Sequence, residues 1–220
     1  MEHTVKILKT ENITHDVKHF VLEKPEGYTF EPGQATALSI NKKGHEDEKR
    51  PFTFTSLNSD PHLELIIKIY DGHDGVTKEL GKLQQSDELI IGPPWGTISY
   101  KSPGYFIAGG AGITPFIAIL RHLQKENQLK DNVLYFSNKT TKDIILKEEF
   151  EKMMGENFVN VITHEETNKY INRFIDKDFL KEKINDFSKH FYICGPPRMT
   201  ESIQEALKEL GAKPDALVFE

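Results

Sequence analysis

The sequence predicts a two-part fold, with a β-rich half that forms a small barrel and an α/β half built on a parallel sheet. Short strand-like runs separated by turn residues fill the first part of the chain up to residue 100, and this spacing is typical of a small β-barrel. Strand-like and helix-like runs then alternate up to residue 219, as in a parallel sheet that crossover helices cover on both faces. The segment Lys101-Ser102-Pro103-Gly104 separates the two patterns, so we expect domains of residues 1–101 and 102–220.

The composition is that of a globular protein, with 220 residues, 37% hydrophobic and 28% charged. The net charge of −6 argues against nucleic-acid binding. No apolar run has membrane-spanning length, and the first residues lack a signal-peptide core, so we expect a cytoplasmic protein without membrane contact. The single cysteine excludes an internal disulfide and a four-cysteine iron–sulfur cluster on this chain. We further expect a monomer.

Seven runs in the first half are rich in β-branched and apolar residues and are expected to be strands. They cover residues 5–8, 17–22, 35–40, 50–56, 63–70, 89–91 and 97–100. Residues 76–83 have helical spacing. Gly75-Val76-Thr77 at their start offers free N–H groups that either bind a phosphate or simply begin the helix.

Arg50 and the strand that follows it carry the polar groups of this half that suit a cofactor. A guanidinium is a fork-shaped donor that matches a diphosphate, although in isolation a solvated loop arginine is the simpler explanation. Thr53 and Thr55 alternate with Phe52 and Phe54, which places the hydroxyls on one face of a strand and the rings on the other. That pattern fits either a half-buried strand or a face that meets a planar cofactor.

A glycine turn opens the second half. Residues 105–108 form a short apolar run, Gly109, Gly110 and Gly112 follow, and Thr114-Pro115 opens a segment with helical spacing. We expect Thr114 to cap this helix and Pro115 to occupy its first position. Because backbone N–H groups and the helix dipole face the same point, such a turn forms an anion site. By itself, the pattern fits a glycine turn without a ligand nearly as well.

Five strands and four helices are expected in this half. The strands cover residues 105–108, 133–137, 159–163, 191–194 and 216–219, and the helices residues 115–126, 147–154, 179–184 and 199–210. Ligands of such sheets bind at the carboxyl ends of the strands. Residues 109–114, 137–140 and 194–197 each follow a strand directly, so we expect them at one edge of a five-stranded parallel sheet.

Cysteine and histidine give few signs of further chemistry. Cys194 ends a buried strand before a rigid turn, so it either fills the core as a small apolar residue or lines the pocket at that edge. His15 and His19 are four residues apart, but their segment is strand-like and has no acidic or cysteine partner at ligand spacing. We therefore expect no metal site.

Three of these stretches resemble, in order, the motifs of the ferredoxin–NADP reductase superfamily. Arg50-Pro51-Phe52-Thr53 is similar to its Arg-x-Tyr-Ser/Thr flavin motif, with Phe52 in place of the tyrosine. Residues 110–115 are similar to its Gly-x-Gly-x-x-Pro nicotinamide motif, and residues 194–197 to its Cys-Gly-Pro-Pro signature. Residues 30–34, 67–70, 75–77 and 92–96 also match, so the resemblance covers nearly the whole chain. Within the superfamily, the chain resembles the short bacterial flavodoxin/ferredoxin reductase-like proteins.

The resemblance implies a six-stranded antiparallel barrel that holds FAD and an α/β domain that holds NADPH or NADH. It further implies a flavin-dependent NAD(P)H oxidoreductase that passes electrons from NAD(P)H through FAD to a separate acceptor, such as ferredoxin or flavodoxin. A non-catalytic flavin- or nucleotide-binding subunit, with a regulatory or electron-transfer role, is the alternative.

By position, the resemblance assigns Arg50 to the flavin diphosphate, Phe52 to the isoalloxazine face and Thr53 to the vicinity of N5. Cys194 would lie near the nicotinamide C4. Glu220 would lie near the same site or be a frayed terminal residue. Thr53, Cys194 and Glu220 are therefore the expected catalytic residues. The expected cofactor-binding residues are Arg50, Pro51, Phe52, Thr53, Ile67, Ile69, Gly75, Val76, Thr77, Gly110, Ala111, Gly112, Ile113, Thr114, Ser137, Lys139, Cys194, Gly195, Pro196 and Pro197.

The choice of nucleotide and the acceptor stay open. The segment 137–140 has no acidic residue to hold a ribose 2′-hydroxyl, and Lys139 could pair with a 2′-phosphate, but no arginine is present there. An acidic carrier protein would need a basic patch on this acidic chain. The cations that could form this patch are Lys42, Lys43, Lys49 and Arg50. A small molecule is the other expected acceptor.

Overall fold

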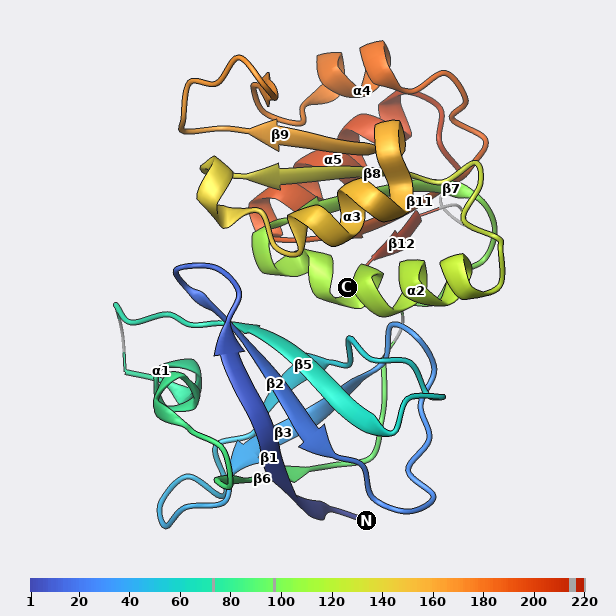
Figure 1. The fold of residues 1–220 in the computed structure, drawn as a ribbon. Helices are drawn as coiled ribbons and strands as arrows, with labels where there is room; N and C mark the ends of the chain where they lie inside the picture. The colour runs from blue at the N-terminus through green and yellow to red at the C-terminus, as the bar shows by residue number, and fades with distance from the viewer. Residues whose placement is uncertain (73, 97, 214–216, 220) are drawn as a thin grey trace.

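The computed structural model describes residues 1–72, 74–96, 98–213 and 217–219, and its two halves lie one on the other (Figure 1). The barrel half contains strands β1 to β6, and the α/β half contains strands β7 to β12. Helix α2 (Thr114–Lys125) lies between the two halves. None of the described helices is long and apolar enough to cross a membrane.

The barrel half is one antiparallel sheet of six strands, as the resemblance implies. Its strands are β1 (His3–Asn12), β2 (Val17–Glu23), β3 (Ala35–Ile40), β4 (Arg50–Thr53), β5 (His62–Lys68) and β6 (Glu88–Ile91). They lie in the order β4-β3-β6-β1-β2-β5, and a bridge between Phe54 and Leu65 brings the two edges together. Both of these side chains are fully buried, so apolar residues of the strands fill the barrel.

One segment of this half differs from the prediction. The helix expected at residues 76–83 is α1 (Val76–Lys82), but the strand expected at 97–100 is wrong for the residues described. Residues 98–100 form no strand, and Thr97 lies outside the described residues. Ile98 is 2% exposed and belongs to the apolar cluster around α2. Its apolar side chain therefore serves a contact between the halves rather than strand pairing.

The α/β half is a parallel sheet of six strands in the order β10-β9-β8-β7-β11-β12. Its strands are β7 (Gly104–Gly109), β8 (Val133–Asn138), β9 (Phe158–Ile162), β10 (Ile171–Asn172), β11 (His190–Cys194) and β12 (Leu217–Phe219). Four of the five predicted strands are confirmed, and so is the described part of the fifth, since Ala216 lies outside the described residues. The sixth, β10, has two residues at one edge, which is too short for an apolar run to reveal it.

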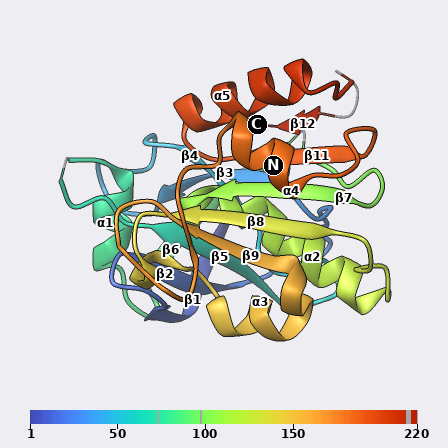
Figure 2. The same ribbon diagram turned by 90° about the horizontal axis from the view of Figure 1, so that it is seen from above.

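Helices cover both faces of this sheet, as the alternation of segments predicts (Figure 2). Helices α2 and α3 (Lys147–Met154) pack on the face that carries Phe106 and Phe136. Helices α4 (Lys177–Lys183) and α5 (Pro197–Glu209) pack on the face that carries Tyr105 and Ile107. Successive residues of β7 thus face opposite layers, as the two-residue period of a strand requires.

The start of α2 differs from the expected cap. A 3-10 turn, η1 (Gly110–Ile113), precedes the helix, so Thr114 is its first residue and Ile113 takes the cap position. The Thr114 hydroxyl donates to the Ala111 carbonyl oxygen at 3.0 Å instead of accepting from a helical N–H. Pro115 lies in the first turn, as predicted. The prediction of a Thr114 cap was wrong because the chain is already turning before the helix begins.

The two halves share one apolar cluster, which we call the seam. The barrel contributes Val17, Ile66 and Ile98, and all three are at most 4% exposed. The side chains that α2 contributes are Phe116, Ile117, Ile119, Leu120 and Leu123. Burying an aliphatic or aromatic side chain of this size stabilises a fold by roughly 1.5–3 kcal/mol. The seam is therefore part of the hydrophobic core rather than a loose contact between domains.

Gly33 lies at the seam with a φ of +96°, and a Cβ atom there would be 2.4 Å from the Ile98 carbonyl oxygen. Gly33→Ala is expected to lower the free energy of unfolding by about 3 kcal/mol, because the clash adds to the ~1–2 kcal/mol cost of a left-handed non-glycine residue. Urea unfolding measures this loss.

Gly44→Ala is the matched control, since Gly44 has a φ of +92° and nothing within 4 Å of its Cβ position. If both variants lost the same free energy of unfolding, the close approach of Gly33 to the Ile98 carbonyl oxygen would contribute nothing to the loss.

Candidate functional site

The two halves enclose a small pocket beside the turn that follows β7. Its volume is about 190 Å³. The barrel lines it with Pro51, Phe52, Thr53, Ile66, Ile67, Lys68, Tyr70 and Thr77, and the α/β half lines it with Ala111 and Thr114. Pockets that enclose whole drug-sized ligands measure roughly 300–1,000 Å³. A ligand of that size would therefore be only partly enclosed here, and the rest of it would lie along the surface.

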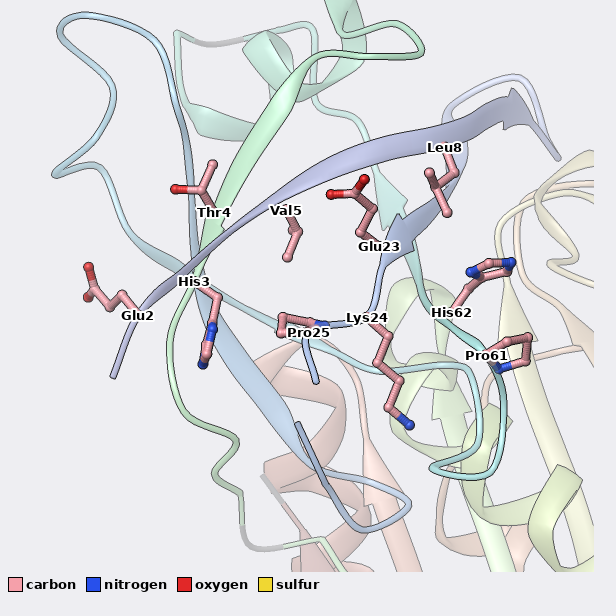
Figure 3. A pocket seen from close by; sticks show the side chains of 10 residues that line it. All are labelled: Glu2, His3, Thr4, Val5, Leu8, Glu23, Lys24, Pro25, Pro61 and His62. Atoms are coloured by element: carbon pink, nitrogen blue, oxygen red, sulfur yellow. The ribbon is translucent and has the colours of Figure 1, made fainter. Parts of the chain in front are cut away.

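A larger hollow of about 630 Å³ lies on the wall of the barrel (Figure 3). Only residues between Glu2 and His62 line it, so the α/β half contributes nothing. Its polar groups already bind neighbours: Glu23 accepts the Lys6 N–H, and Lys24 Nζ donates to the Asn58 carbonyl oxygen. Despite its size, this hollow is not the candidate site.

The sheet order places the smaller pocket at a topological switch point. After β7 the chain continues to β8 on one side, whereas β11 lies on the other side, and open α/β sheets bind ligands where the order reverses. A Cβ atom on Gly112 would be 2.3 Å from the Cys194 carbonyl oxygen and 2.6 Å from the Gly195 nitrogen. Only glycine allows the turns after β7 and β11 to touch in this way.

The other two glycines of this turn have different surroundings. A Cβ atom on Gly109 would be 2.5 Å from Met199 Sδ and 2.9 Å from Pro196 Cδ, so Gly109 is needed for packing. Gly110 has a φ of +51° and nothing within 4 Å of its Cβ position. The backbone at Gly110 is therefore open to a ligand.

Seven of the predicted cofactor-binding residues line the pocket, and three further residues were missed. The seven are Pro51, Phe52, Thr53, Ile67, Thr77, Ala111 and Thr114. The missed residues are Ile66, Lys68 and Tyr70, which come from β5 and the residues just after it. The family-like stretch 67–70 was the available signal, but its pattern does not tell which side chains face the ligand.

Other predicted residues lie around the pocket without lining it. Arg50 is exposed at the start of β4, where Nη1 donates to the Lys49 carbonyl oxygen at 2.8 Å. Gly75 is exposed before α1, and Ser137 and Lys139 lie at and just after the end of β8. Gly195, Pro196 and Pro197 form the turn after β11 and the start of α5.

Three predicted residues have side chains that serve packing. Val76 and Ile113 are 5% and 0% exposed in the two cores, and Ile69 packs against the barrel core. Only their backbones are left to meet a cofactor. Glu220 lies outside the described residues.

Thr53 and Cys194 lie on the same side of the molecule, on opposite halves. Thr53 shares the pocket with Ala111 and Thr114, and Gly112 of the same turn lies against Cys194. The Cys194 side chain is half-buried. The glycine turn thus connects the two expected catalytic residues that the structure describes.

These groups fit a flavin and a nicotinamide dinucleotide. Phe52 offers apolar surface for a planar ring, Thr53 adds a hydroxyl beside it, and Ile67, whose side chain is buried in the barrel core, borders the pocket. Arg50 forms no ion pair with a carboxylate in the described part of the chain, so its forked donors are available to a diphosphate. Open backbone at Gly110, at the start of a helix, suits a second anionic group.

An ion pair borders the pocket. Lys68 Nζ lies 2.7 Å from Asp16 Oδ2, and although burial opposes it, this ammonium holds the pKa of Asp16 below its ordinary value. Among the described residues, the ligand atoms of His15, Asp16 and Asp143 lie within 4.8 Å of one another. Lys68 already balances Asp16, so we assign no metal there, and the absence of a metal site stays a prediction.

The expected basic patch is interrupted by carboxylates. Lys42 Nζ lies 3.1 Å from Asp87, and Lys49 pairs with Glu2. Residues 46–48 of the same loop are all acidic. Residues 42–50 therefore present a mixed surface rather than a basic one.

Family models match both halves of the chain. Residues 4–100 match an oxidoreductase FAD-binding domain, and residues 106–205 match an oxidoreductase NAD-binding domain. The chain belongs to the ferredoxin–NADP reductase superfamily and carries the domains that bind FAD and a nicotinamide dinucleotide.

Curated relatives agree with this assignment. The chain is 30% identical to NADH-cytochrome b5 reductase 2 of Mycosarcoma maydis over 92% of its own length and 63% of that protein. It is 27% identical to the reductase component of propane 2-monooxygenase of Rhodococcus jostii over 98% of its length and 62% of that protein. The chain thus spans less than two thirds of both relatives.

Solved structures share the fold. The FAD/NAD-binding domain of Vibrio cholerae nitric oxide dioxygenase superposes with a TM-score of 0.87 at 20% identity, covering 99% of this chain and 97% of that one. A ferredoxin NADP+ reductase from Neisseria gonorrhoeae also gives 0.87 at 20% identity, covering 100% and 98%. At this identity the likeness concerns the fold alone.

Gly112→Ala is expected to weaken NAD(P)H binding at least about tenfold and to leave the flavin content unchanged. The added methyl group forces apart the turns after β7 and β11, and a displacement of about 1 Å in such a site has large effects. Calorimetric titration of the purified protein with NADP+ and with NAD+ measures the affinity.

Gly155→Ala is the matched control, because Gly155 has a φ of +55° and open space at the end of α3. If Gly112→Ala bound both nucleotides as tightly as this control, the contact with Cys194 would not matter for binding.

Proposed function

We propose that the chain is an NAD(P)H-dependent flavin oxidoreductase that passes electrons through FAD to a separate acceptor. The observation that supports this most is the pocket itself. It joins Phe52 and Thr53, in the half that matches an FAD-binding domain, to Ala111 and Thr114, in the half that matches an NAD-binding domain. We also propose residues 1–101 and 102–220 as the two functional domains.

We assign different parts of the cofactors to different residues in and around the pocket. Arg50 binds the flavin diphosphate, and Gly75 to Thr77 contribute backbone N–H groups to it. Phe52 would offer its ring to the flavin, and Thr53 would offer its hydroxyl beside it. The turn of Gly110 to Thr114 and the turn of Cys194 to Pro197 hold the nicotinamide half, and Cys194 shapes the approach to it.

FAD held at this site would supply the redox chemistry: a hydride, which is two electrons and a proton, would come from NAD(P)H, and two electrons would then pass to the acceptor and a proton to solvent. The protein sets distance, orientation and access. Ile66 and Ile67 keep the inner wall of the pocket apolar.

The acceptor we propose is a separate electron-carrier protein. Named relatives include cytochrome b5 reductases and the ferredoxin–NAD(P)+ reductase component of a naphthalene dioxygenase system. Because residues 42–50 present a mixed rather than a basic surface, we favour a carrier whose docking does not depend on strong charge attraction. NADH and NADPH are both candidate donors, and we propose Lys139 as the residue that would pair with a 2′-phosphate.

Anaerobic addition of NADH or NADPH to the purified yellow protein is expected to bleach its flavin absorbance. Comparing the two nucleotides by their rates of reduction identifies the donor. A yellow protein that neither nucleotide bleaches would instead support the alternative, a non-catalytic flavin-binding subunit.

Arg50→Ala is expected to weaken FAD binding about 10–100-fold, because a hydrogen bond to a charged group contributes roughly 1.5–3 kcal/mol. The flavin-to-protein ratio after gel filtration, and FAD rebinding followed by fluorescence, measure the effect. Lys43→Ala removes a cation from the neighbouring exposed loop and serves as the control. Equal flavin retention in both variants would contradict the role of Arg50.

A further inference from the structure

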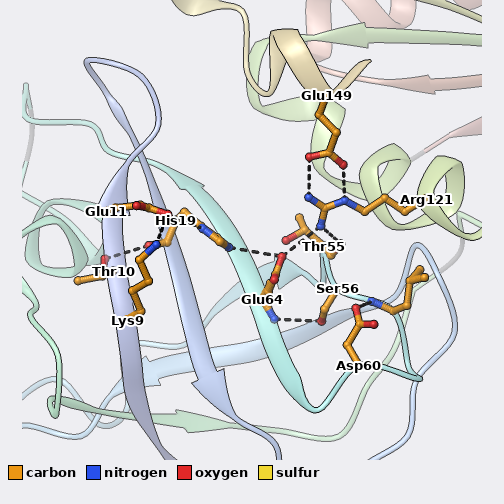
Figure 4. A network of polar contacts seen from close by, with 11 residues as sticks. Lys9, Thr10, Glu11, His19, Thr55, Ser56, Asp60, Glu64, Arg121 and Glu149 are labelled. Atoms are coloured by element: carbon orange, nitrogen blue, oxygen red, sulfur yellow. Dashed lines mark hydrogen bonds and ion pairs between the residues drawn. The ribbon is translucent and has the colours of Figure 1, made fainter. Parts of the chain in front are cut away.

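Arg121 binds both halves of the molecule at once (Figure 4). It projects from α2, and its Nε and Nη2 donate to the two carboxylate oxygens of Glu149 on α3 at 2.6 and 2.8 Å. Its Nη1 donates across the seam to the Thr55 carbonyl oxygen at 2.8 Å and to Glu64 Oε2 at 3.1 Å. One guanidinium thus joins two helices of the α/β half to two segments of the barrel.

The barrel groups that Arg121 contacts lie where the barrel closes. Strands β4 and β5 are the two edges of the sheet. They meet through the Phe54–Leu65 bridge and through the Thr55 N–H, which donates to the Glu64 carbonyl oxygen at 2.9 Å. These edges also carry most of the barrel residues of the pocket, with Thr53 on β4 and Ile67 on β5. Arg121 therefore holds both pocket-lining edges next to the point where they join.

Helix geometry connects Arg121 to the other wall of the pocket. Thr114, which lines the pocket, lies seven residues before Arg121 on the same helix. Seven residues make nearly two turns, so the two side chains share one face, roughly 10 Å apart along the axis. The contact of Arg121 with the Thr55 carbonyl oxygen therefore fixes how closely the face of α2 that carries Thr114 approaches the barrel segment that carries Thr53.

The charges around Arg121 favour a fixed geometry. Burial acts to lower the pKa of its guanidinium, but Glu149 and Glu64 raise it. His19 Nε2 lies 3.4 Å from Glu64 Oε2, and this ring together with Arg121 lowers the pKa of Glu64 against the effect of burial. Arg121 and Glu64 side chains are 22% and 28% exposed. A bidentate guanidinium with this much burial is more rigid than a surface ion pair.

We propose that Arg121 is a positioning residue that sets the separation of the flavin-side and nicotinamide-side walls of the pocket. This inference rests on the proposed function. Arg121 touches no reacting group and acts through Thr55, Glu64 and α2. Its loss is expected to slow hydride transfer between cofactors that still bind.

Stopped-flow reduction at saturating NAD(P)H tests the proposal with Arg121→Ala and Arg121→Lys. The limiting rate of flavin reduction is expected to fall roughly 10–100-fold, because a shift of about 1 Å between reacting groups has effects of this size. The dissociation constants of NAD(P)H and FAD are expected to stay within about threefold. Lysine keeps the charge but lacks the fork, so Arg121→Lys is expected to fall short of the original rate.

Lys125→Ala is the matched control. Lys125 lies one turn further along α2 and also crosses the seam, but through a single exposed hydrogen bond to Ser59 Oγ at 2.8 Å. Its removal is expected to leave the limiting rate unchanged. A thermal melt of every variant separates loss of folded protein from loss of rate.

Hydrogen–deuterium exchange of the purified protein gives a readout that does not depend on turnover. Residues 51–57 and 111–117 are expected to exchange faster in Arg121→Ala and as before in Lys125→Ala.

Unchanged limiting rates in both Arg121 variants would overturn the proposal, and so would a loss that follows only the fraction of unfolded protein. If Arg121→Ala fails to fold, Arg121→Lys decides by the same rate. If NAD(P)H does not reduce the unaltered protein, the proposed function is wrong, and unchanged exchange in the two pocket segments would then refute the positioning role as well.

Discussion

Burial of one side of helix α2 against the barrel is the constraint on which the rest of the molecule depends. The helix starts at the glycine turn after β7, so its position fixes that turn. Its apolar side chains share one cluster with Val17, Ile66 and Ile98 of the barrel. Moving the barrel away from α2 would expose this cluster to water, so the pocket beside it has walls that cannot separate freely.

The second constraint on the site is the close contact between two turns of the α/β half, which only glycine allows. Backbone of the turn after β7 lies against backbone of the turn after β11, at a distance that a Cβ atom on Gly112 would forbid. The switch point of the sheet is therefore built from main-chain contacts. Side chains of the barrel then complete the pocket from the other half, so neither half alone contains the site.

Local patterns predicted most of the elements, because apolar spacing and turn residues act within a few residues of the chain. The boundaries of α3 and the five main strands of the sheet follow from such patterns. Residues 98–100 form no strand although Ile98 is apolar, because an apolar side chain can be buried at the seam as well as within a strand. The basic patch expected from Lys42 and Lys49 is interrupted by Asp87 and Glu2, which are distant in sequence and which no local pattern reveals. No pattern in the neighbouring sequence marks Ile66 as a pocket residue.

The seam has a consequence for dividing or recombining this protein. Dividing the chain near residue 101 separates the strand-rich part of the sequence from the part in which strands and helices alternate. The division also leaves Ile98 and Ile66 of the barrel without the helix that covers them. An isolated barrel fragment would expose this apolar face to water and would tend to associate through it. A chimaera that borrows the nucleotide half from a relative inherits a foreign α2, and its success depends on how well the borrowed helix matches that face.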